Sequence, residues 1–383
     1  MKRIIVCVLM VCLMLSGAFA ETAVYTATEN DQSAVDVSGT QSLTITDALI
    51  QKTAGEASSA DASSFRGVNA AVRVYDQATL TLSHSVIEAS ASNATGVFAY
   101  DGGTVELSDC TVTVTGGGAG GIQVAGGGTL TGNNLTVTSA SKAAIRSDRG
   151  GGTMVLDGGT YTSTGTNGCP AIYSTADISV SNAVCVSERS RAVIIEGMNS
   201  VTLENVILEG NDQSSRNGSI HANVLLYQSA SGDAREGTSV FSMTGGSMKA
   251  HSGAMFYCTN TSSEITLHDA ELELSKDGTL LIVSAGRWGR EGRNGGQCML
   301  RTENQQLTGS ISVDSISSLD LQMQATEFTG CINTNQEGGS VRVSMDEDST
   351  WKLTGDSYLT EFEGDLSQID RNGYTLYVNG AVV

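Results

Sequence analysis

The sequence predicts an all-β protein: a single right-handed parallel β-helix with three strands per coil, about twelve coils and a cap at each end. Three observations favour this fold class: a repeat of about 24 residues, apolar residues that fall in columns, and Asn, Asp or Gly at one aligned turn. A β-sandwich or an antiparallel barrel would not explain a repeat that preserves these columns. The right-handed coil is expected from the usual hand of parallel crossover connections.

The repeat begins at regularly spaced positions along the chain. Successive starts lie 23 to 25 residues apart at Thr79, Thr104, Thr129, Thr153, Asp177 and Ser200. Each unit contains three short strand patterns separated by turns, as in TLTLSHSVIEASASNATGVFAYDGG. The steps from Ser42 to Thr79 and from Ser200 to Thr238 are longer, which indicates inserts in these units. Units between Cys298 and Gly339 are shorter.

Apolar and polar residues alternate in the three strands, as expected when one face of a strand lies in a core. The first strand is expected to point inward at Leu43 and Ile45, Leu80 and Leu82, Val105 and Leu107, Ile178 and Val180, Val201 and Leu203, and Ile265 and Leu267. The second strand gives the inward column Ile50, Ile87, Val112, Val137, Tyr161, Cys185, Leu208, Met248 and Leu272. The third strand gives the inward column Val72, Val97, Ile122, Ile145, Ile172, Val193, Val224, Met255 and Leu280.

The residues that follow each third-strand position are expected to point outward. They are Arg73, Phe98, Gln123, Arg146, Tyr173, Ile194, Leu225, Phe256 and Leu281. This column becomes apolar in its second half, so it needs a cover or serves as an interaction patch. Inserts lie near the apolar half of the column, so we expect them to cover it locally.

The turn between the first and second strands carries residues that tolerate a left-handed backbone. The aligned positions are Asp47, His84, Asp109, Asn134, Gly158, Asn182, Asn205, Gly245 and Asp269. Because Asn, Asp and Gly adopt positive φ readily, a sharp corner is predicted at these positions, with stacked side chains that hydrogen-bond from coil to coil. The single proline agrees, since stacked coils need nearly every backbone N–H.

Four segments are predicted along the chain. Residues 1–20 are typical of a secretory signal peptide, with two basic residues, an apolar run and Ala-Phe-Ala before the cleavage site. Residues 21–41 are expected to form an N-terminal cap, residues 42–339 the β-helix repeats, and residues 340–383 the last coil and the C-terminal cap. We therefore expect a protein that is secreted, extracellular or associated with the cell surface.

Charge and cysteine content narrow the function classes. The formal net charge of −20 argues against nucleic acid as a partner, because the phosphate backbone is repelled. No further apolar stretch approaches the length of a membrane span, so no membrane insertion is expected. Six cysteines follow residue 20, without a C-x-x-C pair, and their disulfide pairing is left open. No metal motif is present, so we expect no cofactor; calcium is left open as an alternative that no motif supports.

The T-L-T-L units and the closing segment from Trp351 to Gly380 resemble the pectate-lyase-like right-handed parallel β-helix superfamily. More narrowly, they are similar to secreted, adhesin-like or carbohydrate-binding β-helix proteins of Gram-positive bacteria. The unit pattern covers about residues 42–339. This resemblance implies that the chain could degrade pectin. The Asn-Thr-Asp, Asp-Asp and Gly-His-Gly strings that galacturonan hydrolases of this fold carry are absent from the sequence.

An alternative catalytic site involves charged residues on the outward side of the third strand. Arg146 and Asp148 lie two coils before Glu196, a separation that one sugar could bridge. Inverting hydrolysis needs two facing carboxylates, and lyase chemistry needs a basic residue with a carboxylate-bound calcium. The competing interpretation is a surface network of ion pairs.

The inserts supply the candidate binding residues. Residues 54–67 and 211–222 precede the third strand, whereas residues 229–237 and 286–297 follow it. The ligand-binding candidates are Tyr227, Arg235, Arg287, Trp288, Arg290 and Arg293. Trp stacks on sugar rings and Arg pairs with carboxylates, which predicts a glycan site. The competing interpretation has Trp288 folded onto the coil and the arginines paired with nearby acids.

The favoured hypothesis is a secreted, non-catalytic, adhesin-like monomer that binds glycans or other surface partners through loops of the middle-to-late coils. The alternative is a polysaccharide lyase or glycoside hydrolase acting on an extracellular polysaccharide. A scaffold without a small ligand is a further alternative. Ice binding is disfavoured because the outward threonine column is interrupted by Glu106, Val155 and Ser179.

Overall fold

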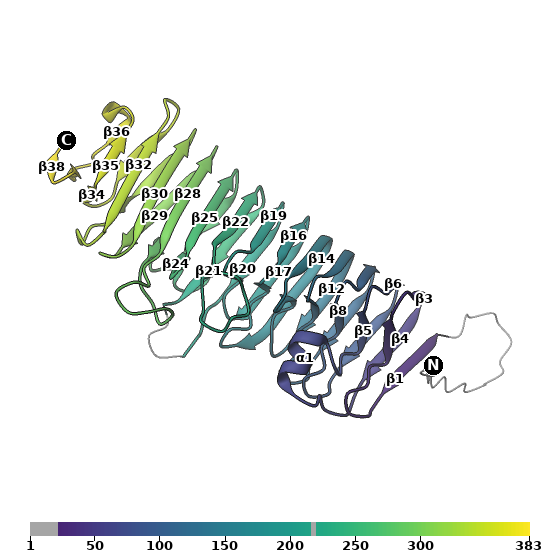
Figure 1. Ribbon diagram of the computed structural model, residues 1–383. Coiled ribbons are helices and arrows are strands. Elements are labelled where there is room, and N and C mark those ends of the chain that lie inside the picture. Colours follow the sequence, from purple (N-terminus) through teal and green to yellow (C-terminus); the bar gives the residue numbers. More distant parts are fainter. Residues whose placement is uncertain (1–21, 216–219) are drawn as a thin grey trace. The chain divides into compact units, whose positions relative to one another are not determined.

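The computed structural model describes residues 22–215 and 220–383, so the expected signal peptide lies outside the described residues. The chain divides into two compact units, of which the first ends at Tyr161 and the second begins at Thr162. Each unit is a stack of parallel strands (Figure 1). The strand β14 (Gly152–Thr166) includes the division.

The first unit has three columns of parallel strands, one for each strand of a coil. The first column contains β3 (Ser42–Thr46), β6 (Thr79–Ser83), β9 (Thr104–Ser108) and the start of β12 (Gly128–Ser139). The second contains β1 (Ala23–Ala27), β4 (Ala48–Lys52), β7 (Val86–Ala89), β10 (Thr111–Val114) and the end of β12. The third contains β2 (Val35–Ser38), β5 (Val72–Tyr75), β8 (Val97–Tyr100), β11 (Ile122–Ala125) and β13 (Ile145–Ser147).

The second unit contains the same three kinds of column. The first column contains β16 (Asp177–Ser181), β19 (Ser200–Glu204), β22 (Thr238–Thr244), β25 (Ser262–His268), β28 (Gln297–Glu303), β30 (Ser318–Gln324), β32 (Ser340–Met345) and β35 (Glu361–Glu363). The second contains β17 (Val184–Arg189), β20 (Ile207–Gly210), β23 (Ser247–Ala250) and β26 (Glu271–Glu273). The third contains β15 (Ile172–Ser174), β18 (Val193–Glu196), β21 (Ala222–Tyr227), β24 (Ala254–Thr259), β27 (Thr279–Val283), β29 (Gln306–Val313), β31 (Glu327–Ile332), β33 (Thr350–Leu353) and β36 (Ile369–Asp370).

The parallel register confirms the β-helix predicted from the repeat. In the first unit, Val97 pairs with Val72 on one side and with Ile122 on the other. In the second unit, Cys185 pairs with Leu208 in the second column. All five side chains are fully buried, so the alternation in sequence corresponds to a continuous core inside each unit.

The corners confirm the predicted turn column. All nine aligned residues from Asp47 to Asp269 have positive φ, between 48° and 69°. The Asn134 Nδ2 donates a hydrogen bond to Asp109 Oδ1 of the previous coil at 2.7 Å. Two later corners, Asn304 and Ala325, also have positive φ and were not recognised in the sequence.

The first coil departs from the expected burial at Leu43. This side chain is 38% exposed, although the equivalent Leu80 of the next coil is fully buried. Among the described residues, β3 pairs only with β6, so the first column ends there and nothing covers Leu43 from the other side.

The third column contains a register difference at β24, where Phe256 rather than Met255 pairs with Val224. Phe256 therefore points into the core, where its ring lies edge-to-face with that of Phe241 at a centroid distance of 5.6 Å. The sequence-based expectation that Phe256 faces outward is wrong. All six residues of β24 are buried, so the alternation that would reveal the inward face is lost.

The same difference continues into β27, where Leu281 pairs with Phe256. Leu281 is thus inward, in the place expected for Leu280, and the outward places belong to Tyr257 and Ile282. A shift of one residue exchanges the inward and outward faces of a strand. The inward and the outward residues of β24 and β27 therefore both differ from those expected.

The late coils of the second unit are shorter than the others. Gln297 pairs with Ser318 and Ser318 with Ser340, so these coils repeat after 21 and 22 residues. Among the described residues the second column ends at β26, and β29, β31 and β33 lead directly from the corner into the third column. These coils therefore have two strands instead of three. A small third sheet lies in the C-terminal segment and contains β34 (Ser357–Leu359), β37 (Leu376–Val378) and β38 (Ala381–Val382). A 3₁₀ helix, Leu366–Gln368, precedes β36.

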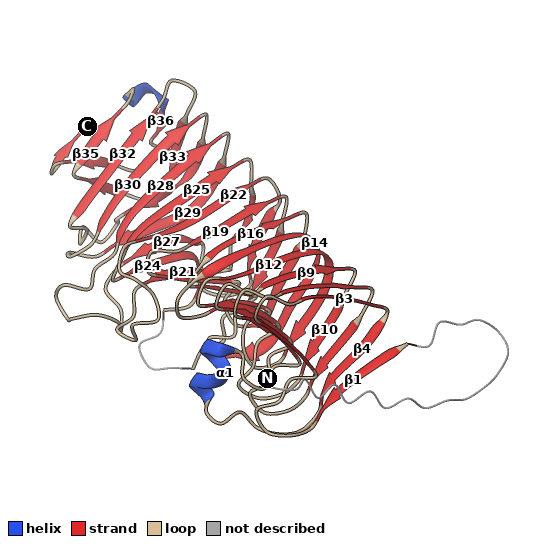
Figure 2. Ribbon diagram, turned by 45° about the vertical axis from the view of Figure 1, so that its right-hand side comes forward, coloured by secondary structure: helices blue, strands red, loops and turns tan. Residues whose placement is uncertain are grey.

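The first insert folds as a helix outside the strands of the first unit (Figure 2). Helix α1 (Ala60–Arg66) begins after Ser59, whose side chain accepts the Ala62 N–H. It ends at Gly67, where φ is 64° and a Cβ atom would lie 2.4 Å from Phe98 Cγ. The helix therefore covers Phe98, which is fully buried. In the described part of the chain, no helix has the length and apolar character that crossing a membrane requires.

Candidate functional site

The second unit presents an arginine-rich segment between β27 and β28. We call residues 286–296 the arginine loop; its side chains include Arg287, Arg290 and Arg293, all of which are exposed. Between the described residues, no ion pair joins these three guanidinium groups to a carboxylate. The loop carries these three positive charges and one negative charge, that of Glu291, so in a chain with a net charge of −20 it is a positive element that can meet an external anion.

The base of the arginine loop is held by one buried side chain. The Asn294 Nδ2 donates hydrogen bonds to the carbonyl oxygens of Gly286, at 2.8 Å, and Trp288, at 2.9 Å. The Asn260 N–H donates to the Asn294 carbonyl oxygen at 3.1 Å. The loop is thereby closed on itself and attached to the corner of the preceding coil.

Trp288 is half-buried and packs between two other side chains of the second unit. Its ring lies against the ring of Tyr227, with a centroid distance of 4.5 Å and an interplanar angle of 47°. The Arg287 guanidinium lies over the indole at 4.3 Å from the centroid, in cation–π geometry. Both contacts hold the indole on the coil.

An apolar cluster on the outward side of the third column lies beneath Trp288. Trp288, Tyr173 and Ile282 pack as half-buried residues against the buried members Ile194, Ala222, Leu225, Tyr227, Ala254 and Tyr257. The inserts thus cover the outward apolar column locally.

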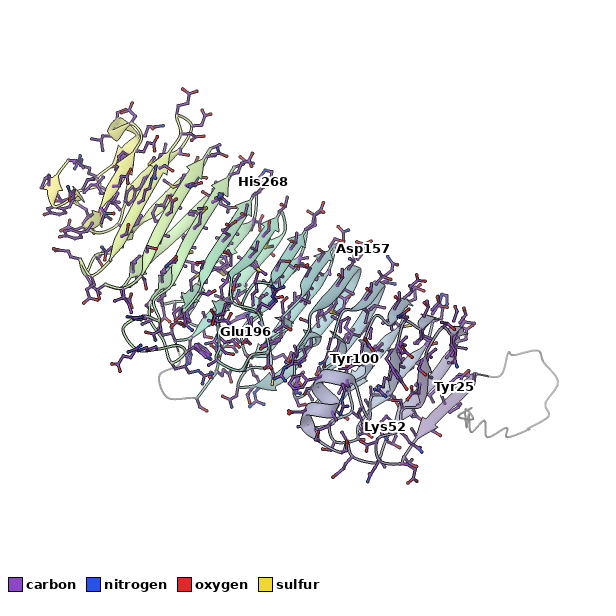
Figure 3. All side chains as sticks on the ribbon, viewed as in Figure 1. Tyr25, Lys52, Tyr100, Asp157, Glu196 and His268 are labelled. Atoms are coloured by element: carbon purple, nitrogen blue, oxygen red, sulfur yellow. The ribbon has the colours of Figure 1, made fainter. Side chains whose placement is uncertain are left out.

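Glu196 lies at the end of β18 on the side of the second unit from which the inserts project (Figure 3). Its Oε2 accepts hydrogen bonds from the hydroxyls of Tyr173, at 2.5 Å, and Tyr227, at 2.7 Å. Its Oε1 accepts from Ser229, and from Ser231 at 3.4 Å. The carboxylate is only 1% exposed and connects the strand to the segment 229–237.

Arg191 and Asp212 form a second buried polar contact in this unit. The Arg191 Nη2 lies 3.1 Å from Asp212 Oδ2 and donates to the Ile220 carbonyl oxygen at 2.7 Å. Burial lowers the pKa of Arg191, an effect that the neighbouring Asp212 carboxylate opposes. This pair fixes Asp212 and Ile220 of the insert to the turn that precedes β18.

The catalytic candidates Arg146 and Asp148 belong to the first unit. Two Arg146 nitrogens, Nε and Nη2, each lie 2.8 Å from Asp148 Oδ2, which also accepts the Gln123 Nε2 at 3.2 Å. The Asp148 residue is 2% exposed, and Gln123 in turn donates to the Ser64 carbonyl oxygen of α1 at 2.8 Å. These residues therefore connect the third column to the helix that covers it.

The remaining binding candidates differ in exposure. Arg235 is exposed, and its carbonyl oxygen accepts the Met198 N–H at 2.8 Å. Tyr227 is 7% exposed and uses its ring for Trp288 and its hydroxyl for Glu196. Sequence reasoning missed Ser229 and Ser231 as partners of Glu196, because short polar residues in a loop carry no signal of a contact with an earlier coil.

An open hollow of about 570 Å³ lies where the second column ends in the second unit. Carboxylates line it, from Asp269, Glu271 and Glu327. Across residues 22–215 and 220–383, no three His, Cys, Asp or Glu side chains are arranged to hold a metal ion. Sequence reasoning missed this hollow because it arises from the change in coil shape after β26.

Comparisons with known proteins return no match: no family model, no curated protein and no solved structure is similar to this chain at a significant level. The function is therefore inferred from the chain's own residues, namely the parallel β-helix coils and the geometry of the arginine loop.

Proposed function

We propose that this chain is a secreted, non-catalytic, adhesin-like β-helix protein of the pectate-lyase-like superfamily, which binds acidic glycans as a monomer. The arginine loop is the proposed binding element. The observation that carries the proposal is the display of Arg287, Arg290 and Arg293 on a fixed loop without carboxylate partners in the described chain.

Charge recognition, rather than ring stacking, is the proposed mode of binding. Arg287 covers one part of the Trp288 ring and Tyr227 another, so the indole acts as a support for the loop. Guanidinium groups pair with carboxylates through two parallel hydrogen bonds, a geometry that uronic acid residues of a glycan can meet. Such binding weakens as salt screens the charges.

The non-catalytic part of the proposal rests on how the candidate catalytic groups are engaged. Asp148 accepts hydrogen bonds from Arg146 and Gln123, and Glu196 accepts them from tyrosine and serine hydroxyls. Both residues are at most 2% exposed. A general acid or base must reach the bond that it cleaves, so these contacts favour a structural role.

The experiment measures retention of the purified protein on immobilised polygalacturonate, alginate and heparin, with dextran as the neutral glycan. Replacement of Arg287, Arg290 and Arg293 by Gln is expected to reduce affinity for the acidic glycans at least tenfold. The charge-matched control replaces the exposed residues Arg189, Lys276 and Lys352 by Gln and is expected to keep most of the affinity.

Two outcomes would contradict the proposal. Equal loss of affinity in the loop variant and the charge-matched control would assign binding to overall charge and not to the loop. Release of unsaturated or reducing-end sugars, with or without calcium, would identify a polysaccharide lyase or hydrolase instead. Loss of such products on Arg146→Ala would place that activity at the first-unit site.

A further inference from the structure

Two cysteine side chains of the second unit lie in direct contact inside the core. The sulfur of Cys258, in β24, is 3.6 Å from the sulfur of Cys298, in β28. Cys258 is fully buried and Cys298 is 3% exposed. The two sulfurs face each other across the core, from the third column to the first.

The backbone next to Cys298 is also close to Cys258. A Cβ atom at Gly296 would lie 2.6 Å from the Cys258 carbonyl oxygen, so only glycine allows this approach. The arginine loop ends at Gly296, and Cys298 follows directly in β28. The position of Cys298 is therefore set by the loop base as well as by the strand.

We propose that Cys258 and Cys298 form a disulfide when the chain folds in the presence of an oxidising low-molecular-weight disulfide. A disulfide bond requires the sulfurs to approach from the present 3.6 Å to about 2.05 Å. The proposal goes beyond glycan binding and does not depend on it. It agrees with the expected export of the chain, since disulfides form in oxidising compartments.

The reaction is thiol–disulfide exchange in two steps. The thiolate of one cysteine attacks the added disulfide, forms a mixed disulfide and releases one thiol. The second cysteine, after loss of its proton, attacks the protein sulfur of the mixed disulfide and releases the second thiol. Two protein thiols are oxidised, the added disulfide is reduced to two thiols, and both protons and both electrons leave with them.

The structure also determines when the bond can form. Hydrogen bonding to Cys258 and burial raise the pKa of Cys298 well above its ordinary value, so the folded, reduced protein holds it as an unreactive thiol. No oxidant reaches two sulfurs with such low exposure. The bond is therefore expected to form while the chain folds, and the folded, reduced protein should resist oxidation.

The disulfide would close the chain between β24 and β28. The enclosed segment, residues 259–297, contains β25, β26, β27 and the arginine loop. A cross-link of this kind restricts the unfolded chain and holds both ends of the segment together in the folded one. It would thereby secure the base of the arginine loop.

The test unfolds the reduced protein and refolds it in a mixture of reduced and oxidised glutathione. The refolded protein is expected to be about 2 Da lighter than the reduced protein, because two hydrogen atoms are lost. After alkylation, tryptic digestion should yield one disulfide-linked pair, residues 250–276 joined to residues 294–301. The thermal midpoint of the oxidised protein should fall by several degrees when reductant is added.

The matched variants separate this pair from the other buried thiols. Cys298→Ser should abolish the mass change, whereas Cys185→Ser, at another fully buried cysteine, should retain it. If Cys298→Ser fails to fold, the tryptic peptide map of the unmodified protein still decides the test, because it identifies the linked cysteines directly. A refolded chain in which Cys258 and Cys298 are both alkylated, or in which either is linked to another cysteine, would overturn the proposal.

Discussion

The ring of Trp288 packs on that of Tyr227, while the hydroxyl of Tyr227 donates a hydrogen bond to Glu196 at 2.7 Å. One tyrosine thus connects the arginine loop to a buried carboxylate of the third column. Because Glu196 also accepts hydrogen bonds from Ser229 and Ser231, the same carboxylate connects two inserts of the second unit. The position of the arginine loop therefore depends on Tyr227, two coils earlier, and on Glu196, three coils earlier.

Replacement of Trp288 by Ala is expected to loosen the arginine loop. The change removes the contacts with Tyr227 and Arg287 and costs about 2 kcal/mol of loop stability, less than a fully buried Trp would. Tryptic cleavage after Arg290 and Arg293 should then become at least tenfold faster. Trp288→Phe keeps an apolar ring and should stay near the unmodified rate; equal cleavage rates in all three proteins would contradict the supporting role of Trp288.

Replacement of Glu196 by Ala is expected to destabilise the second unit by about 3 kcal/mol. The change leaves the hydroxyls of Tyr173 and Tyr227 inside the protein without their acceptor, and buried polar groups without a partner are costly. Urea unfolding followed by circular dichroism measures the loss. Glu204→Ala, at an exposed position of β19, is the control and should change the free energy of unfolding by less than about 0.5 kcal/mol.

The sequence contained enough information to predict the coils but not every register. The corner residues, such as Asp109 and Asn134, are identifiable because a left-handed backbone favours few residue types. The inward column is identifiable wherever polar residues alternate with it. In β24 all residues are buried, so Met255 and Phe256 are equally suited to the core, and the choice depends on the pairing with Val224.

The candidate site was predictable in composition and not in geometry. The arginine loop stands out because its charge opposes that of the chain, so Arg287, Arg290 and Arg293 were found directly. From the sequence, Trp288 either stacks on a sugar or folds onto the coil, and its contact with Tyr227 was not predicted, because it joins residues of different coils. Such contacts depend on the loop's path, which the repeat does not describe.

Phe256→Ala is expected to cost about 3–5 kcal/mol, because it opens a cavity beside Phe241 in the core. Phe256→Leu keeps most of the volume and should cost less than about 1.5 kcal/mol. Denaturant unfolding of both variants measures the difference. A change below about 0.5 kcal/mol for Phe256→Ala would indicate a surface position and contradict the inward assignment.

Ala325→Gly is expected to stabilise the protein by about 0.5–1 kcal/mol. Ala325 occupies a corner with φ of 43°, where a Cβ atom is unfavourable and glycine is not. The backbone N–H that donates to Asp346 is kept, so the corner should retain its hydrogen bonds. Asn134→Ala is the opposite change at an equivalent corner and should destabilise by about 1–2 kcal/mol; the same sign for both variants in thermal unfolding would contradict the argument.

The buried thiol of Cys185 is expected to make stability fall in alkaline solution. Burial raises the pKa of this thiol to about 12 from its ordinary 9.0, so the folded state keeps the proton that the unfolded chain loses above pH 9. The contribution is fully present below pH 9 and decreases by about 1.4 kcal/mol per pH unit as the pH rises towards 12. Denaturant unfolding of the unmodified protein and of Cys185→Ala between pH 8 and 11 gives the free energy of unfolding of each against pH. The difference between the two slopes isolates the contribution of Cys185. Parallel curves would show that Cys185 ionises as readily in the folded chain as in the unfolded one, against the burial that the second column imposes.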